Sequence, residues 1–201
     1  MCGRYQLDED LRDAYLNEQV ADAARLSERL NIPMLRAGEI RPTDVAPVLA
    51  PSAVHRRIGA FPMQWGFTHP TKGMLVFNTR SETAAEKDLF CTSIDERRCL
   101  IPASRYFEWH KAETGKKERY AFAAEDQAPL YLAGLYVRAK DRFETPCFSI
   151  LTRDAAPNIK DLHPRMPVLV PRERMEEWLS KDTDFNRMID SLWQSVTAVR
   201  G

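Results

Sequence analysis

The sequence predicts an α+β fold, a single compact domain with a curved, mainly antiparallel, barrel-like β core flanked by helices. Two observations predict this fold. Short segments of strand-like composition recur along the chain between turn residues, and only a few segments have the three- and four-residue apolar spacing of a helix. No internal repeat, low-complexity tract or linker interrupts the chain, so we expect one domain over residues 1–201.

Composition narrows the class of protein. Lysine plus arginine number 29, as do aspartate plus glutamate, so any nucleic-acid binding would need a local basic cleft. No apolar segment approaches the roughly 20 residues that span a bilayer, and the N-terminus lacks a signal pattern. The four cysteines are far apart without CxxC spacing, which argues against a zinc ribbon or a disulfide framework. We therefore expect a cytoplasmic protein without membrane association, metal or cofactor.

The first third of the chain predicts one helix and one extended segment. Apolar residues recur at helical spacing from Asp8 to Leu30, with acidic residues at the start of the segment and Pro33 after its end. Two prolines exclude a helix between Arg41 and Leu49. Because proline cannot donate to a sheet ladder, we expect this segment at an edge.

The remaining elements alternate between strands and short helices. Met74 to Phe77 has the composition of a central strand, and Ala112 to Lys117 is typical of a hairpin turn. The other strand patterns are Val54 to Phe61, Met63 to Phe67, Arg98 to Ile101, Tyr106 to His110, Tyr120 to Ala123, Leu130 to Val137, Cys147 to Thr152 and Met166 to Val170. Helices are expected from Ser81 to Glu86, capped by Ser81 or Thr79, from Asp154 to Leu162 and from Arg172 to Ser180.

Cys2 is the first candidate reactive group. Removal of Met1 would place an α-amine, with a pKa of about 8, and a thiol, with a pKa of about 8.5, on one residue. Both groups would then have a usable nucleophilic fraction near neutral pH. With an aldehyde, such an aminothiol forms a Schiff base and then closes a thiazolidine ring. The alternative is an incidental cysteine on a frayed terminus.

Asn78 and Arg80 follow the apolar run at Met74 to Phe77. Residues two apart in a strand share a face, so both side chains can point into one cleft. The asparagine amide suits a reactive amine, and the arginine fork suits a phosphate. A simple strand-to-helix turn with a solvated arginine explains the pattern equally well.

Glu108 lies between Phe107 and Trp109, and in a strand it shares its face with Tyr106. A carboxyl group in apolar surroundings has a raised pKa and suits general acid catalysis near pH 7. The alternative is a cross-strand salt bridge to a nearby arginine.

His163 precedes Pro164, which favours an extended conformation and fixes the direction of the imidazole. Histidine is the usual proton carrier at neutral pH, although a lone histidine is more often structural. His55, His69 and His110 lack this context and are interpreted as surface residues. Trp65 and Pro42 could stack or wedge against bases, although a Trp-Gly pair usually packs in a core.

Taken together, these segments resemble the SOS response-associated peptidase (SRAP) family of abasic-site processing proteins. The resemblance covers nearly the whole chain through Cys2–Tyr5, Arg41–Val48, Trp65–Phe67, Asn78–Thr83, Cys99–Ala103, Tyr106–Trp109 and His163–Pro167. Two positions depart from the family pattern, since Thr79 stands where alanine is common and Arg105 where glycine is common.

The resemblance implies an active site formed by Cys2, Asn78, Glu108 and His163, and a basic cleft for single-stranded DNA. The implied substrate is an abasic site, whose ring-opened aldehyde would be trapped and shielded as a thiazolidine crosslink during the DNA damage response. We expect Asn78 to position the amine, Glu108 to protonate the sugar oxygen and His163 to assist imine formation and its reversal.

Arg4 and Arg80 are expected to hold flanking phosphates, and Pro42 and Trp65 to contact neighbouring bases. The Schiff base could also lead to a weak lyase activity. The family name implies a hydrolase that cleaves itself to expose Cys2, although an aminopeptidase would suffice for Met1. We expect a monomer that joins the nucleoid when bound to DNA. Two rival classes remain, an N-terminal-nucleophile cysteine amidohydrolase and a non-catalytic DNA-binding module.

Overall fold

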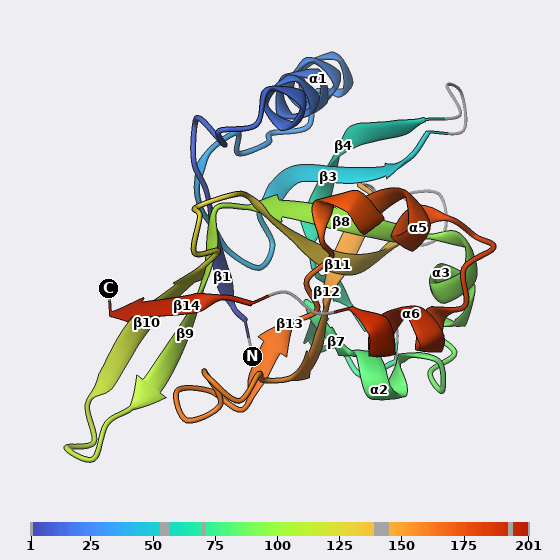
Figure 1. Ribbon diagram of the computed structural model, residues 1–201. Helices are drawn as coiled ribbons and strands as arrows, with labels where there is room; N and C mark the ends of the chain where they lie inside the picture. Colours follow the sequence, from blue (N-terminus) through green and yellow to red (C-terminus); the bar gives the residue numbers. More distant parts are fainter. Residues whose placement is uncertain (1, 53–56, 70, 139–144, 193–194, 201) are drawn as a thin grey trace.

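Two mainly antiparallel sheets dominate the computed structural model, which describes residues 2–52, 57–69, 71–138, 145–192 and 195–200 (Figure 1). Sheet A has the order β14–β10–β9–β1–β2, with the bounds Thr197–Arg200, Lys117–Ala123, Arg105–Lys111, Arg4–Leu7 and Gly38–Ile40. Sheet B has the order β11–β8–β3–β4–β12–β13, with the bounds Leu130–Val137, Arg98–Ala103, Val45–Pro51, Ile58–Trp65, Cys147–Asp154 and Arg165–Pro167.

Sheet B is closed on itself. Strand β11 pairs with β8 on one side and with β12 on the other, so that β11, β8, β3, β4 and β12 form a ring. Strand β7 (Asn78–Arg80) joins outside this ring by parallel pairing with β12. The predicted α+β fold with a curved, mainly antiparallel and barrel-like core is confirmed.

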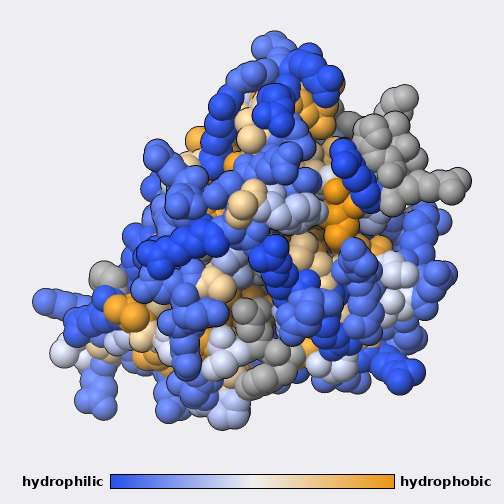
Figure 2. Space-filling model, turned by 45° about the horizontal axis from the view of Figure 1, so that its top comes forward, coloured by the Kyte–Doolittle hydropathy of each residue, from blue (hydrophilic) through white to orange (hydrophobic). Residues whose placement is uncertain are grey.

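The helices cover the outside of the sheets. Helix α1 (Ala14–Leu30) packs on β3 and β4, while α2 (Ser81–Ala84), α3 (Cys91–Glu96), η1 (Arg172–Arg174), α5 (Met175–Leu179) and α6 (Phe185–Ser191) lie around the far side of sheet B (Figure 1). The face that includes α1 is mostly hydrophilic, with apolar side chains visible only as small patches (Figure 2). No helix in the described part of the chain combines the length and apolarity needed to cross a membrane.

Helix α1 begins later than predicted. Asp13 caps it by accepting a hydrogen bond from the Leu16 amide, so the acidic residues 8–10 precede the helix. The Asn17 side chain accepts from the Leu11 amide and the Asp10 side chain from the Arg12 amide. These local bonds compete with helical ones and hold residues 10–12 in a turn. The helix ends at Leu30 as predicted, with Asn31 in the left-handed conformation.

The proline-containing strands are internal, which corrects the prediction of an edge. Strand β3 pairs with β4 and also contacts β8 through Leu49 and Leu100. Pro47 lies opposite Pro62, and the strand pattern predicted up to Phe61 runs through Pro62 to Trp65 as one strand. Neither proline stands where its strand pairs with the outer neighbour, since β3 meets β8 at Leu49 and β4 meets β12 at Gln64 and Trp65. Val54 and His55, at the start of the predicted strand, lie outside the described residues.

The apolar run at residues 74–77 is not a central strand. Only Leu75–Val76 forms a strand, β6, which pairs with β5 (Phe67–Thr68) in a separate two-stranded sheet. Met74 is 59% exposed, whereas Thr79 in the following strand β7 is buried. A run of four apolar residues is too short to fix its partner, and here the next three residues enter the main sheet instead.

Several boundaries and one helix also differ from prediction. Residues 157–162 form successive turns rather than a helix, with bonds from the Leu162 and His163 amides to the Ile159 carbonyl. Neither predicted cap of α2 acts as one, since Ser81 donates to the Thr152 carbonyl and Thr79 bonds Ser149. Helices α3 and α6 and strand β14 were not predicted.

Candidate active site

Strand β1 places Cys2 inside the molecule rather than on a frayed end. The strand lies between β2 and β9 in sheet A, and Cys2, two residues before its first residue Arg4, is completely buried. The thiol Sγ lies 3.4 Å from the carbonyl oxygen of Arg4. The Cys2 carbonyl accepts a 2.6 Å hydrogen bond from Nδ2 of Asn78. The first and seventh strands therefore bring together two predicted site residues that are 76 positions apart.

Asn78 keeps part of its amide available. Its Nδ2 is committed to the Cys2 carbonyl, while its buried Oδ1 has no hydrogen-bond partner among the described residues. An unsatisfied buried acceptor is unfavourable, by about 1–3 kcal/mol, unless a donor reaches it. This carbonyl oxygen can accept from an amine or hydroxyl group placed beside Cys2.

Glu108 shares the inner face of sheet A with Tyr106, as strand alternation predicts. Only 4% of Glu108 is exposed, and burial raises the pKa of its carboxyl group to about 7. Arg119, on the neighbouring strand, bonds Glu39 rather than Glu108, so the alternative prediction of a salt bridge to an arginine is not met among the described residues. A carboxyl group with this pKa can both donate and accept a proton near neutrality.

His163 faces Glu108 across the site. Its Nε2 lies 3.6 Å from Oε2 of Glu108, and its Nδ1 lies 2.9 Å from the carbonyl oxygen of Arg165. The Arg165 carbonyl needs a proton on Nδ1, whereas the Arg165 amide, 3.2 Å from the same nitrogen, needs Nδ1 as an acceptor. The shorter contact favours the tautomer with the proton on Nδ1, in which Nε2, the nitrogen directed at Glu108, is basic. Burial lowers the pKa of His163, which favours the neutral ring. The pair can therefore exchange a proton.

The thiol of Cys2 differs from the sequence-based expectation. Burial, followed by the neighbouring Glu108 charge, raises the pKa of this thiol far above its usual range. The thiol is therefore neutral at pH 7, and the expected usable fraction of thiolate is absent from this arrangement. Sulfur chemistry here requires a base to take the thiol proton.

The residues predicted to contact DNA are dispersed. Arg80 is exposed at the end of β7, two residues after Asn78. Arg4 lies on the opposite face of β1 from the buried Tyr5, where it donates to Glu39 at 2.7 Å and lies over the ring of Trp109. Pro42 is half-buried in the turn between β2 and β3.

Trp65 belongs to the core. Its ring is completely buried against Tyr5, Phe77 and Phe148, and its Nε1 donates to the Phe77 carbonyl at 2.8 Å. A DNA base cannot reach this ring in this conformation. The packing interpretation of the Trp-Gly pair is the one that the structure supports.

Sequence reasoning missed two pairs of residues around the site. Tyr5 and Tyr106 face each other across β1 and β9, both are completely buried, and neither hydroxyl has a hydrogen-bond partner among the described residues. Arg165 bonds Glu82 at 2.7 and 2.9 Å beside His163. Alternation placed Tyr106 on the face of Glu108, but nothing in the sequence pairs Tyr106 with Tyr5 or Arg165 with Glu82.

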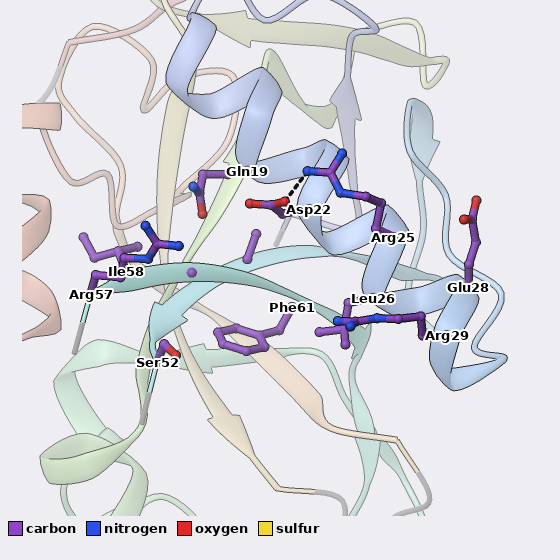
Figure 3. A pocket seen from close by; sticks show the side chains of 12 residues that line it. Gln19, Asp22, Arg25, Leu26, Glu28, Arg29, Ser52, Arg57, Ile58 and Phe61 are labelled. Atoms are coloured by element: carbon purple, nitrogen blue, oxygen red, sulfur yellow. Dashed lines mark hydrogen bonds and ion pairs between the residues drawn. The ribbon is translucent and has the colours of Figure 1, made fainter. Parts of the chain in front are cut away.

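One cavity adjoins the site and another does not. A cavity of about 650 Å³ includes Asn78 in its lining, together with the half-exposed Leu75 and Met74. A cavity of about 660 Å³ lies between α1 and β4, where Leu26 and Phe61 form its floor and Arg29 and Arg57 its rim (Figure 3). The second cavity shares no lining residue with the four-residue site. Within the described ranges, no cluster of three or more histidine, cysteine or acidic side chains could hold a metal ion.

Comparison with known proteins identifies the family. The family described as SOS response associated peptidase (SRAP) matches residues 1–200. "Abasic site processing protein YoqW" of Bacillus subtilis is 29% identical over 199 residues, covering 92% of this chain and 83% of the relative. "Abasic site processing protein YedK" of Escherichia coli is 29% identical over 188 residues, covering 90% and 81%.

Solved structures show the same fold at lower sequence identity. A Bacteroides thetaiotaomicron protein superposes with a TM-score of 0.76 and 22% identity, covering 99% of this chain and 91% of the other. A phage-related protein of Bordetella bronchiseptica has a TM-score of 0.74 and 22% identity, covering 100% and 94%. The ring-shaped sheet and its flanking helices are therefore an arrangement shared with these proteins.

Proposed function

This chain belongs to the SOS response associated peptidase (SRAP) family, and from that premise we propose that it processes abasic sites in single-stranded DNA. In this proposal Cys2, freed of Met1, traps the ring-opened sugar as a thiazolidine crosslink. The main support for the proposal is the 2.6 Å hydrogen bond from Asn78 Nδ2 to the Cys2 carbonyl. Beside it, Oε2 of Glu108 and Nε2 of His163 are 3.6 Å apart. A terminal aminothiol next to two proton-transfer groups has the parts that aldehyde trapping requires.

The amine acts first. The buried thiol is neutral, whereas a free α-amine with a pKa of about 8 is partly unprotonated at pH 7. The Asn78 side chain holds the Cys2 carbonyl through Nδ2, and its Oδ1 accepts one amine N–H. The amine nitrogen attacks C1′ of the aldehyde, and the resulting alkoxide takes a proton to give a carbinolamine.

Glu108 and His163 then move protons. Protonated Glu108 donates to the carbinolamine hydroxyl, which leaves as water and yields the imine. Glu108 is then ionised, and Nε2 of His163 is the basic nitrogen beside it, so this pair can take up the next proton. The thiol proton passes to this pair as sulfur bonds to the imine carbon, and the ring nitrogen regains a proton. One water is released overall.

The remaining parts of the proposal concern the DNA and side reactions. Arg80 and Arg4 contact phosphates without reading sequence, and Pro42 contacts a neighbouring base. The imine can also lose the 3′ phosphate by β-elimination, which is a weak lyase activity. Removal of Met1 by self-cleavage would be the peptidase activity of the family name. The protein works as a monomer in the cytoplasm, on the nucleoid.

A mass-spectrometric assay tests the proposal. The wild-type protein, mixed with a single strand containing one abasic site, should give a heat-stable adduct without reductant, at the summed mass less one water. Cys2→Ala should give no heat-stable adduct, whereas Cys99→Ala, which alters another completely buried cysteine, should retain it.

Three outcomes contradict the proposal. An adduct seen only after borohydride reduction would indicate a Schiff base without ring closure. Hydrolysis of a small amide without any adduct would favour the amidohydrolase class. Binding of single strands without covalent product would indicate a DNA-binding module.

A further inference from the structure

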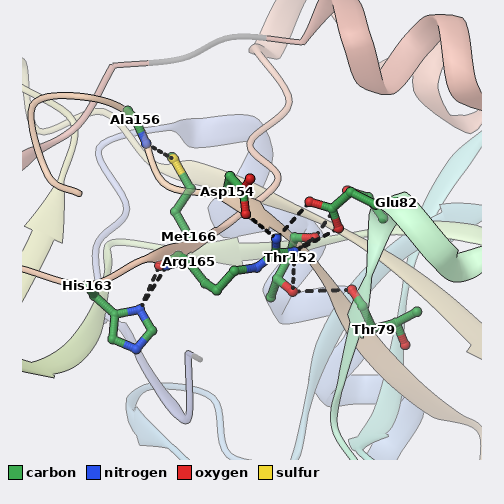
Figure 4. A network of polar contacts seen from close by, with 9 residues as sticks. Thr79, Glu82, Thr152, Asp154, Ala156, His163, Arg165 and Met166 are labelled. Carbon is green, nitrogen blue, oxygen red and sulfur yellow. Dashed lines mark hydrogen bonds and ion pairs between the residues drawn. The ribbon is translucent and has the colours of Figure 1, made fainter.

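Hydrogen bonds on both terminal nitrogens hold the guanidinium group of Arg165 (Figure 4). Nη1 donates to Glu82 Oε1 at 2.7 Å and to Asp154 Oδ1 at 2.6 Å. Nη2 donates to Glu82 Oε2 at 2.9 Å and to the Thr152 carbonyl at 2.7 Å. Only 13% of the Arg165 side chain is exposed. The group is therefore fixed by two segments, α2 and the end of β12.

The backbone of Arg165 is part of the candidate active site. Its carbonyl oxygen lies 2.9 Å from Nδ1 of His163 and accepts the proton on that nitrogen. The Arg165 amide lies 3.2 Å from the same Nδ1, but a donor there would need an unprotonated Nδ1, and the shorter contact requires a protonated one. The position of this carbonyl therefore decides which ring nitrogen carries the proton, and so whether the Nε2 that faces Glu108 is basic.

The Arg165–Glu82 pair also joins the two sides of the site. Glu82 lies in α2, which starts directly after β7, the strand that carries Asn78. Arg165 starts β13, two residues after His163. Both segments flank β12, where Thr152 is paired with Arg80 on one side and Pro167 on the other. A bidentate ion pair across β12 sets the spacing between these segments.

The charge around Arg165 argues against a phosphate as its main partner. Two carboxylates, from Glu82 and Asp154, surround one guanidinium, so the cluster carries one net negative charge. The hydrogen bonds from Arg165 lower the pKa of Glu82, which keeps this carboxylate ionised. An incoming phosphate would have to displace acceptors at 2.6–2.9 Å and approach this negative cluster.

We propose that Arg165, locked by Glu82, is a positioning residue that holds His163 with its Nδ1 protonated and its Nε2 directed at Glu108. The proposal rests on the function proposed above, since its effect on rate is exerted through the Glu108–His163 proton pair. When the Arg165–Glu82 ion pair is weakened, the Arg165 carbonyl can move. The His163 imidazole then populates the other tautomer or turns away from Glu108. The crosslinking step slows while binding to undamaged DNA is kept.

Arg165→Lys and Glu82→Gln test this role. Lysine keeps the charge without the planar fork, and glutamine keeps the shape without the second carboxylate oxygen. Arg174→Lys is the matched control, because Arg174 makes an equivalent two-bond pair with Glu177 at 2.8 Å on the surface of the α5 region. Thermal unfolding of each variant establishes that it is folded.

Two readouts distinguish positioning from a merely structural role. Nitrogen-15 NMR of the DNA-free protein should show His163 protonated at Nδ1 in the wild type and in Arg174→Lys, and a tautomer mixture in Arg165→Lys and Glu82→Gln. Single-turnover crosslinking at saturating DNA should slow by about ten- to a hundredfold in both site variants, as for a displaced catalytic group. The pH profile should change shape in these variants and affinity for undamaged single strands should not.

Other results overturn the proposal. Weaker binding of undamaged strands with an unchanged saturated rate would identify Arg165 as a phosphate contact. An unchanged His163 tautomer with an unchanged rate, or equal slowing in Arg174→Lys, would remove the positioning role. If the wild type forms no adduct, the proposed function fails, and the NMR measurement still decides whether Arg165 fixes the imidazole.

Discussion

Two ionisable side chains, Arg98 and Glu108, are buried in consecutive strands, and their surroundings differ. Arg98, at the start of β8, is 3% exposed, and Glu108, in β9, is 4% exposed. The Arg98 guanidinium donates to the carbonyls of Ile94 at 2.6 Å, Trp178 at 3.4 Å and Thr183 at 2.6 Å. It also lies over the rings of Trp178 and Phe185. Its charge is compensated by fixed dipoles and rings.

Glu108 receives no such compensation from an arginine. Burial raises the pKa of its carboxyl group to about 7, so the fold disfavours its charged form and keeps a histidine nitrogen 3.6 Å away. A buried charge surrounded by acceptors is part of the scaffold, whereas a buried acid with a raised pKa is suited to move protons. The contrast predicts which substitution affects stability and which affects chemistry.

The largest expected effect is on the rate of crosslinking. Glu108→Gln removes the proton donor while keeping the shape of the side chain, so the single-turnover rate should fall by about 10²–10⁴-fold. The free energy of unfolding at pH 7 should not decrease, because the buried carboxyl group is replaced by a neutral amide. Quench-flow crosslinking and urea unfolding measure the two quantities. A rate within twofold of the wild type would break the contrast.

Arg98→Met should have the opposite profile. It leaves the carbonyls of Ile94 and Thr183 buried without their donor, so the free energy of unfolding should fall by about 2–5 kcal/mol. The crosslinking rate per folded molecule should be unchanged, because Arg98 contacts none of the four site residues. Urea unfolding combined with active-site titration tests this. A free energy of unfolding equal to that of the wild type would show that the hydrogen bonds from Arg98 to these carbonyls do not stabilise the fold.

The pH dependence of stability sharpens the same comparison. The pKa of Glu108 is about 7 in the folded chain and near 4.5 in the unfolded chain, so the folded state binds more protons between these values. Its contribution is present below pH 4.5 and is lost as pH rises to about 7, a loss of about 3 kcal/mol. The wild type should therefore lose stability relative to Glu108→Gln over this window. Parallel pH curves would contradict the raised pKa.

The family segments named four candidate residues that the structure brings close together, although they come from four separate parts of the chain. Cys2 bonds Asn78, Glu108 lies near His163, and the Glu108 charge acts on the Cys2 thiol. The burial of Trp65 and the exposure of Met74 were not predictable, because both depend on which strand each segment joins. Pairing across the closed sheet is set by the whole chain rather than by a window of residues.

The partners of charged residues were the least predictable feature. Glu82 and Arg165 are 83 positions apart, and nothing in their neighbours indicates that they meet. Asp13 shows the same limit, since residues 8–10 looked like an acidic first helical turn and Asp13 proved to be the cap. Local propensity gives the element, and tertiary contacts decide where it starts and what it bonds.

The smallest expected effect concerns a charge that is neither buried nor paired. Arg80 is exposed and has no hydrogen-bonding or ionic partner within the described part of the chain, unlike Arg98 and Arg165. Arg80→Ala should leave the free energy of unfolding nearly unchanged, within about 0.5 kcal/mol. If Arg80 contacts one phosphate, the slope of log affinity against log salt on single-stranded DNA should decrease by about 0.7. Arg25→Ala, which breaks only a surface pair with Asp22 on α1, is the control and should keep the wild-type slope. Equal slopes for both variants would place the DNA away from the end of β7, whereas a lower slope for Arg80→Ala alone would place it beside Asn78.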